Sequence, residues 1–292
     1  MYYLIYGAMY LFSLLPLRVL YVFSDLIYGL VFYVFKYRRV IVSNNLAIAF
    51  PDKTDKERKK IEKQFYHNLI DTFIESLKFV SISKKEIQRR ATAEFELIND
   101  LTDKGLNVHI MAGHQFNWEF GNALCAMSLK IPFAGVYMPI SNKSLDRIFY
   151  KFRGKYGTVL ISAPDFKNKM HEVFSKQYTL GLAADQNPGD PSNAYWMNFF
   201  GRPVPFVTGP AKGAVKNNTA VVMVGFHKLK RGHYHFSTRT ITENATDFTP
   251  AELTRLYKIE LEKIILQDPA NYLWSHRRFK YEWKKEYGEL IW

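Results

Sequence analysis

The sequence predicts an α/β fold: a central, mostly parallel β-sheet flanked by helices and preceded by an N-terminal hydrophobic helical membrane anchor. Short apolar runs alternate with amphipathic runs between residues 108 and 184, a pattern typical of strands joined by helical crossovers. Residues 1–35 are almost entirely apolar. With 292 residues, 48% of them hydrophobic, the chain can bury a substantial core.

The first segment, residues 1–38, is predicted to be the membrane anchor. It is uncharged up to Leu17, and after Arg18 the apolar run resumes as "VLYVFSDLIYGLVFYVF". It has neither the basic start nor the small-residue cleavage site of a signal peptide, so we expect it to be retained. Because Pro16 and Asp25 interrupt the run, a tilted span and an interfacial hairpin are both open. A buried helical pair of a soluble protein is the alternative.

Basic residues follow this segment directly, in "KYRR" at 36–39. By the positive-inside tendency they predict that residues 39–292 form a cytoplasmic domain. The whole chain has 40 Lys plus Arg against 27 Asp plus Glu, a formal charge of +13. This excess predicts an anionic partner, such as a membrane surface, a phosphorylated substrate, an acidic carrier protein or nucleic acid.

The domain is expected to open with a long helix in the stretch "DKTDKERKKIEKQFYHNLIDTFIESLKFV", residues 52–80. Apolar residues recur every four positions along it, and Thr54 is its candidate N-cap. Strands are then expected at 108–112, 132–138, 158–162 and 178–184, and helices at 117–129, 142–157 and 165–176. The most irregular segment, 185–210, is rich in proline and glycine and follows a strand, where parallel sheets keep their chemistry.

The stretch "GHQFNWEF" at 113–120 carries the candidate catalytic residues. If Asn117 caps the following helix, His114 lies on the loop and Glu119 in the first helical turn. We expect Glu119 to stay ionised near the helix N-terminus and to hydrogen-bond one imidazole nitrogen. The other nitrogen of His114 can then take a proton from a hydroxyl or an amine. A loop histidine beside a capping glutamate is the non-functional alternative.

"GHQFNWE" resembles the His-x4-Asp/Glu block of the glycerolipid acyltransferase superfamily, in the form carried by the late lipid A acyltransferases, which add secondary acyl chains to a lipid A precursor. Four further blocks continue the resemblance over about residues 38 to 280: "RRVIVSNNLAIAFPDKTDKER", "GVYMPISNKSLDRIFYKFRGKYG", "ADQNPGD…WMNFFGRPVPFVTGPAKGAVKNNTAVV" and "YLWSHRRFK". Their order along the chain makes the resemblance more specific than any one motif.

The resemblance implies an acyltransferase in which His114 is the general base and Glu119 its charge partner. The acceptor hydroxyl would attack an acyl thioester supplied by acyl carrier protein, and no metal or cofactor is implied. The acceptor would be a lipid, phosphorylated in the case of a lipid A precursor. The location implied is the cell inner membrane, with the catalytic domain on its cytoplasmic face.

Nine further residues are expected to bind substrate: Asn117, Arg147, Arg153, Asp185, Gln186, Thr208, Gly209, Arg277 and Arg278. Asp185 matches an Asp-Gln pair of the family, or else holds its loop in shape. Thr208 and the helix start after it would lie near the developing oxyanion. Arg277 and Arg278 would bind acceptor phosphates through planar guanidinium groups, or else form structural pairs.

Met138 stands where the family commonly has an arginine. Arg147 or Arg153 is expected to compensate, and another amphiphile, such as a lysophospholipid, an amino-acid lipid or a pigment, is the alternative acceptor. The acyl chain needs an apolar groove beside the site. Aromatic residues near the candidate loops are the expected lining, with core packing as their alternative role: Phe116, Trp118, Phe120, Trp196, Phe199, Phe200 and Phe206.

Other classes of protein fit less well. The single cysteine, Cys125, excludes an internal disulfide framework and is expected to be buried packing. His227, His233 and His235 lack an accompanying acidic ligand for zinc. The sequence lacks the G-x-S-x-G elbow that is typical of serine hydrolases. It also lacks any recognised nucleic-acid-binding motif. A non-catalytic membrane-binding module remains a rival, but it leaves the arrangement around His114 unexplained.

Overall fold

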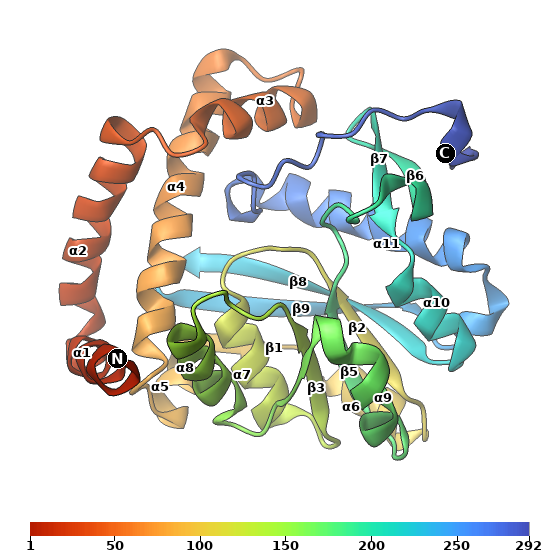
Figure 1. The fold of residues 1–292 in the computed structure, drawn as a ribbon, viewed down its shortest axis with the longest axis horizontal. Coiled ribbons are helices and arrows are strands. Elements are labelled where there is room, and N and C mark those ends of the chain that lie inside the picture. The colour runs from red at the N-terminus through yellow and green to blue at the C-terminus, as the bar shows by residue number, and fades with distance from the viewer. Residues whose placement is uncertain (292) are drawn as a thin grey trace.

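The computed structural model describes residues 1–291 and confirms the α/β prediction. Seven strands form the main sheet in the order β1-β9-β8-β2-β5-β3-β4, and every neighbouring pair is parallel except β8 and β9 (Figure 1). Their bounds are β1 Ala91–Ala93, β2 Val108–Ala112, β3 Phe133–Tyr137, β4 Val159–Ser162, β5 Thr179–Ala183, β8 Ala220–Lys230 and β9 His233–Thr242. The strands and helices expected between residues 108 and 184 are all present.

Helices cover both faces of this sheet (Figure 1). The helices α10 and α11 lie on one face, and α6 and α7 lie on the other. The helices after α4 are α5 Lys84–Arg90, α6 Glu96–Asp103, α7 Trp118–Ser128, α8 Lys143–Gly154, α9 Phe166–Phe174, α10 Gly209–Lys216 and α11 Pro250–Gln267. Short 3-10 turns are Ala163–Asp165, Pro191–Asn193, Ala245–Asp247, Pro269–Asn271 and Lys285–Tyr287.

The N-terminal segment folds onto the rest of the chain. It comprises α1 Tyr2–Leu14, α2 Leu17–Gly29 and the π-helical turn η1 Leu30–Val34, followed by α3 Arg39–Ala49 and α4 Asp55–Lys78. Figure 1 shows α2 running alongside α4, and Leu20, Tyr28 and Phe32 are buried there. Among residues 1–291, Leu17–Val34 is the one helical stretch long and apolar enough to cross a membrane, with 28% of it buried.

The long helix α4 begins as predicted. Thr54 accepts the Glu57 amide N–H at 3.3 Å, and the Glu57 carboxylate accepts the Thr54 amide N–H at 2.8 Å, which completes a capping box. Phe65 is fully buried, whereas Phe73 is 54% exposed. A repeat of four overshoots the turn of 3.6 residues, so the apolar row drifts around the helix axis.

The segment 185–210 is more regular than its composition predicts. It forms an antiparallel hairpin of β6 Ala194–Phe199 and β7 Arg202–Val207, to which β10 Leu290–Ile291 adds a third strand. Pro203 and Pro205 lie within β7, which is an edge strand. Proline has no N–H to donate to a neighbouring strand, so within sheets it is found on edge strands such as this one. Its presence nevertheless makes the sequence of the segment resemble that of a loop.

Candidate active site

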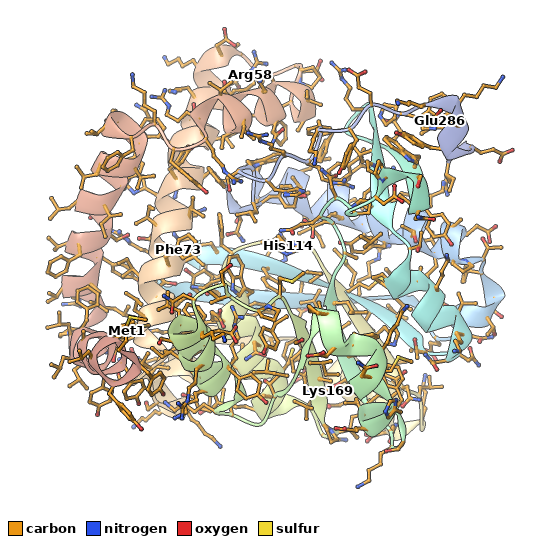
Figure 2. All side chains as sticks on the ribbon, viewed as in Figure 1. Met1, Arg58, Phe73, His114, Lys169 and Glu286 are labelled. Atoms are coloured by element: carbon orange, nitrogen blue, oxygen red, sulfur yellow. The ribbon has the colours of Figure 1, made fainter. Side chains whose placement is uncertain are left out.

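The candidate site lies at the carboxyl ends of two neighbouring parallel strands. Ala112 at the end of β2 pairs with Ala183 at the end of β5, and each chain then enters a loop. His114 and Asp185 are the second residues beyond those ends, and His114 lies near the centre of the molecule (Figure 2). The intervening Gly113 passes so close to Leu261 of α11 that any Cβ there would collide with it.

His114 pairs with Asp185. Its Nδ1 lies 2.6 Å from Asp185 Oδ1, and its backbone N–H donates to both carboxylate oxygens at 3.1 Å. The Tyr272 hydroxyl also bonds to this carboxylate. The Asp185 side chain is 2% exposed, whereas that of His114 is 28% exposed. Asp185 thus fixes Nδ1 and the ring orientation, and Nε2 is the nitrogen left for a substrate.

The pair is electrostatically matched. Burial opposes a charged imidazole, but the Asp185 charge and hydrogen bond outweigh it and raise the pKa of His114 above its ordinary value. Burial alone would favour neutral Asp185, yet the charge of His114 and hydrogen bonds from His114 and Tyr272 lower the pKa of Asp185 to about 2. Asp185 is therefore ionised at neutral pH and makes His114 more basic.

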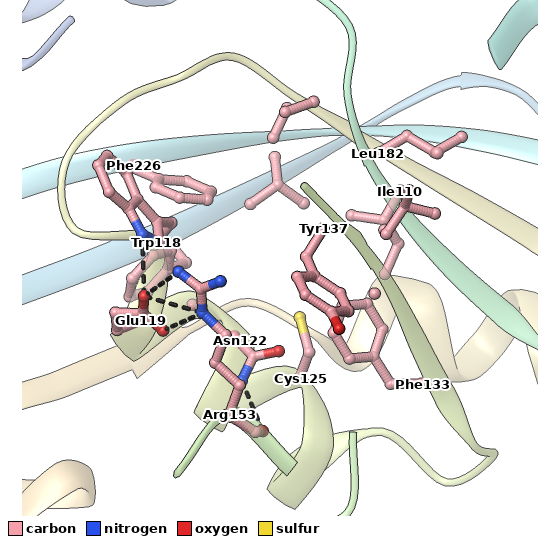
Figure 3. Close-up of a pocket in the computed structure, with 18 of the residues that line it drawn as sticks. Ile110, Trp118, Glu119, Asn122, Cys125, Phe133, Tyr137, Arg153, Leu182 and Phe226 are labelled. Carbon is pink, nitrogen blue, oxygen red and sulfur yellow. Dashed lines mark hydrogen bonds and ion pairs between the residues drawn. The ribbon is translucent and has the colours of Figure 1, made fainter. Parts of the chain in front are cut away.

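The expected hydrogen bond between Glu119 and His114 is wrong. Glu119 Oε1 accepts Arg153 Nη2 at 2.5 Å and Nε at 3.0 Å, and it also accepts the Trp118 indole N–H at 3.0 Å (Figure 3). The first turn of α7 directs the Glu119 carboxylate toward α8. The guanidinium of Arg153 on α8 is a permanent cation and can bond to a carboxylate through two of its nitrogens. Glu119 and His114 nevertheless line the same cavity.

A cavity of about 360 Å³ opens from these polar groups into the domain (Figure 3). His114, Glu119 and Arg153 form much of its polar lining, and the remaining lining is mostly apolar. The apolar lining includes Phe95, Ile110, Trp118, Cys125, Phe133, Leu182, Phe226 and Phe236. A largely apolar cavity that begins at a histidine and carboxylate pair can hold a long aliphatic group with its reactive end near His114.

The predicted groove is mostly wrong, because one of its seven aromatic residues, Trp118, lines the cavity. Phe116 and Phe120 are 1% exposed and belong to the packed core, and Trp196, Phe199 and Phe206 pack around the small hairpin sheet. Most of the residues missed come from the strands and from α7. Gly135 and Gly181 inside strands were a readable signal, since strand glycines often mark an approach of a ligand.

Two residues of α7 and its loop behave as buried groups. Cys125 is buried as predicted, with burial raising the pKa of its thiol, and it also lines the cavity. Asn117 precedes α7 as predicted, but its side chain does not cap the helix. Asn117 Nδ2 donates instead to Glu75 at 2.5 Å.

The remaining predicted substrate-binding residues divide by exposure. Arg147 is exposed on α8, with its guanidinium 4.4 Å from the centre of the Tyr2 ring. Arg277 is exposed, and Gln186 lies half-buried beside Asp185. Arg278 is 1% exposed and donates to Asn187 and to the Pro205 carbonyl, so it holds the loop rather than facing a phosphate.

Thr208 and Gly209 lie where β7 meets α10. In the described chain, residues 1–291, both fall outside the cavity lining, so the expected place beside the oxyanion is not supported. The hairpin of β6 and β7, which the sequence analysis missed, leads directly into this segment. His227 and His235 pair across β8 and β9, and no group of three metal-ligating side chains occurs among the described residues.

The chain is similar to known proteins along most of its length. A family model described as bacterial lipid A biosynthesis acyltransferase matches residues 1–281. A lipid A biosynthesis acyltransferase of Haemophilus influenzae is 25% identical over 249 residues, 83% of this chain and 78% of the relative. A lipid A biosynthesis lauroyltransferase of Escherichia coli is 24% identical over 276 residues, 94% of this chain and 89% of the relative. The chain therefore belongs to the bacterial lipid A biosynthesis acyltransferase family, as its motifs predict, and it is an acyltransferase.

Proposed function

We propose that this enzyme moves a fatty acyl chain from an acyl carrier protein thioester to a hydroxyl of a lipid A precursor, with His114 as general base and Asp185 as its orienting partner. The observation that carries the proposal is the His114–Asp185 pair at the polar end of an apolar cavity. Family membership supports both the reaction class and the choice of acceptor.

The proposed reaction needs no nucleophile from the protein. Nε2 of His114 takes the proton of the acceptor hydroxyl as its oxygen attacks the thioester carbonyl, forming the new C–O bond. The tetrahedral intermediate then collapses, the C–S bond breaks, and the leaving thiolate takes the proton back from His114. Asp185 stabilises the imidazolium that exists between the two proton transfers.

The acyl chain is proposed to occupy the apolar part of the cavity, which lies within the usual range of ligand pockets, about 300–1,000 Å³. Its thioester end would then lie beside His114. Cys125 and Phe133 border this part of the cavity, so their size helps to set the chain length accepted.

Arg153 is proposed to bind oxygens of the substrate. Glu119 holds its Nε and Nη2, which leaves Nη1 as the nitrogen to face an anionic group. Met138 lines the same cavity. A guanidinium at Arg153 can therefore supply the charge that Met138 lacks, which favours a phosphorylated acceptor despite that substitution. Arg277, exposed beside the loop, is a second candidate.

The donor is proposed to dock on α8. Lys143, Arg147 and Lys151 are exposed at a spacing of four residues, so they form one basic row on the helix that carries Arg153. A basic row attracts an acidic carrier protein and steers its approach. This docking would bring the thioester to the cavity from the side of α8.

The membrane is proposed to contact the outer side of α1 and α2. The outward residues of α2 and η1 are large, apolar and exposed: Val22, Phe23, Leu26, Leu30, Tyr33 and Val34. The opposite side carries Tyr21, Ser24 and Asp25, which bond to the domain. This division favours a helix pair lying in the interface of the inner membrane on its cytoplasmic face over a freely spanning helix.

Mass spectrometry of total lipids tests the proposal. Cells lacking this protein are expected to lose one acyl chain from lipid A, and wild type, but not His114→Ala, is expected to restore it. An unchanged lipid A with another acylated lipid missing would move the acceptor and keep the chemistry. Full restoration by a folded His114→Ala protein would overturn the proposed base.

A further inference from the structure

A buried carboxylate on α4 links three separate parts of the fold. Glu75 is 1% exposed and accepts three hydrogen bonds. The Tyr21 hydroxyl of α2 donates to Oε1 at 2.6 Å, the Tyr234 hydroxyl of β9 donates to Oε2 at 2.6 Å, and Asn117 Nδ2 donates to Oε2 at 2.5 Å. A buried carboxylate is tolerated when donors surround it in this way, so each donor is held in place.

The third donor belongs to the active-site loop, residues 113–117. Asn117 is fully buried, three residues after His114 and two before Glu119. Its side chain leaves the helix end uncapped and bonds to Glu75 instead. This hydrogen bond to α4 holds in place the segment that carries His114 and Glu119.

A second set of hydrogen bonds holds the other side of the same loop. The Phe116 N–H donates to the Asn271 carbonyl at 3.0 Å, and Asn271 Nδ2 donates to the Phe116 carbonyl at 2.9 Å. The Leu273 N–H donates to the His114 carbonyl at 3.0 Å. The loop is therefore hydrogen-bonded on one side to the chain near residue 271 and on the other side to Glu75. Loss of either set of hydrogen bonds should make the loop more mobile.

We propose that Glu75 is a positioning residue for the active-site loop, and that its contact with Tyr21 makes the geometry of this loop depend on how α2 sits against α4. The proposal rests on the acyl-transfer function proposed above. Glu75 acts through Asn117 and touches no reacting atom, so it controls how accurately His114 and Glu119 meet the substrate. Small displacements of such groups reduce rate strongly.

Neighbouring contacts keep α2 in register with this cluster. Ser24 Oγ donates to Asp71 at 2.7 Å, and Asp25 forms an ion pair with Arg231 at 2.7 Å. These residues lie one turn beyond Tyr21 on the same side of α2. A shift of α2 caused by lipid at its outer side would therefore change the hydrogen bond between Tyr21 and Glu75.

Two substitutions in the full chain test the proposal. Tyr21→Phe removes one hydroxyl, and Glu75→Gln replaces an acceptor oxygen by an amide that faces donors. Turnover would be measured with an acyl carrier protein thioester and a phosphorylated lipid A precursor in detergent micelles. Amide hydrogen exchange of residues 113–121 would report the loop directly. A double-mutant cycle of Glu75→Gln with Asn117→Ala would show whether the two act through one contact.

We expect kcat to fall by about tenfold to a hundredfold in both single variants, with the KM for the thioester little changed, because positioning is lost rather than binding. Exchange of the loop amides is expected to accelerate. The matched control is Tyr66→Phe, which removes another buried tyrosine hydroxyl on α4, one that donates to the Tyr37 carbonyl away from the loop. This control is expected to keep wild-type kcat.

Wild-type kcat and unchanged loop exchange in Tyr21→Phe would overturn the proposal, as would an equal loss of kcat in Tyr66→Phe. If Glu75→Gln fails to fold, Tyr21→Phe decides the matter alone. A wild-type protein with no transferase activity refutes the proposed function instead, and the exchange measurement then still reports whether Glu75 and Tyr21 hold the loop.

Discussion

The imidazole of His114 bonds to a carboxylate 71 positions away along the chain. Asp185 is buried and ionised, and it reaches both the side chain and the backbone N–H of His114. This fixes the ring and its tautomer together. The basicity of His114 therefore depends on Asp185 rather than on Glu119, although Glu119 is much closer to His114 along the chain.

Activity should depend on pH through this pair. A general base must be neutral, so the rate falls as pH drops through the pKa of His114, which Asp185 raises above its ordinary value. Asp185→Asn removes the negative charge, so the acid limb of kcat/KM against pH should move to lower pH while the maximal rate falls. His114→Ala should lose about 10²-fold or more in rate. An acid limb unmoved in Asp185→Asn would contradict the pairing.

The Glu119–Arg153 ion pair should matter for stability as well as activity. Its side chains are 1% and 18% exposed, respectively. Arg153→Met leaves a buried carboxylate without its cation, which should cost about 3–5 kcal/mol of unfolding free energy. The double variant Glu119→Gln with Arg153→Met should recover much of that stability but not the activity. Urea unfolding of the three proteins measures this, and a cost in Arg153→Met below roughly 1 kcal/mol would argue against a buried pair.

Among the elements, β3 borders the cavity through Gly135. A Cβ built there meets its nearest neighbour, Thr158 Cγ2, at 3.4 Å, which is ordinary contact, so larger side chains can be accommodated toward the cavity. Gly181 on the adjacent β5 differs, because its Cβ would approach Phe133 to 2.7 Å. Gly135 is therefore the better position at which to shorten the cavity.

Gly135→Leu should shift the preferred acyl chain to shorter lengths. Excluding two methylenes from apolar surface forfeits roughly 1.6 kcal/mol, so kcat/KM for the longest preferred chain should fall more than about tenfold. Competition among thioesters of graded chain length measures the shift. Val159→Leu on β4, a 44% exposed position, is the matched control and should leave the preference unchanged. An unchanged preference in Gly135→Leu would place the acyl chain elsewhere.

The helix α8 offers a second test at this scale. Lys143→Glu with Lys151→Glu should raise the KM for the carrier-linked donor about tenfold at low salt, the lower end of charge-steering effects, with less change at high salt. The exposed Lys167 and Lys169 of α9 provide the control when changed in the same way. Equal effects of the two pairs would indicate general attraction to the basic protein rather than docking on α8.

For the whole molecule, the two sides of α2 have opposite roles. The inner side joins the domain through polar contacts, and the outer side presents apolar residues to the surroundings. The formal charge of +13 adds attraction to an anionic surface. Residues 1–38 therefore pack as part of the fold, and their outer side is the surface proposed above to contact a membrane.

Leu26→Asn on α2 should weaken binding to anionic vesicles by about tenfold or more, since a fully buried leucine contributes about 1.5–3 kcal/mol. Leu26 is 64% exposed, so the folded protein should lose little stability. The matched control is Leu266→Asn on α11, at a position 56% exposed, which should leave binding unchanged. Vesicle co-sedimentation compares the two, and equal loss in both would refute an oriented interface.

The sequence by itself determined the local elements. Hydrophobic periodicity predicted the strands and helices from 108 to 184, and Thr54 marked the start of α4 because capping uses neighbouring residues. It also placed His114 on the loop after β2. These features depend on contacts within a few residues, which a linear pattern records.

Tertiary structure alone decided which groups meet. Asp185 reaches His114 because β5 lies beside β2, although β3 and β4 come between them in the chain. Glu119 bonds to Arg153 because α7 packs against α8. The cavity is lined mostly by residues from several strands and α7, and Trp118 is the one expected aromatic residue among them. Strand order and helix packing follow from burying apolar faces across the whole chain, which local spacing does not encode.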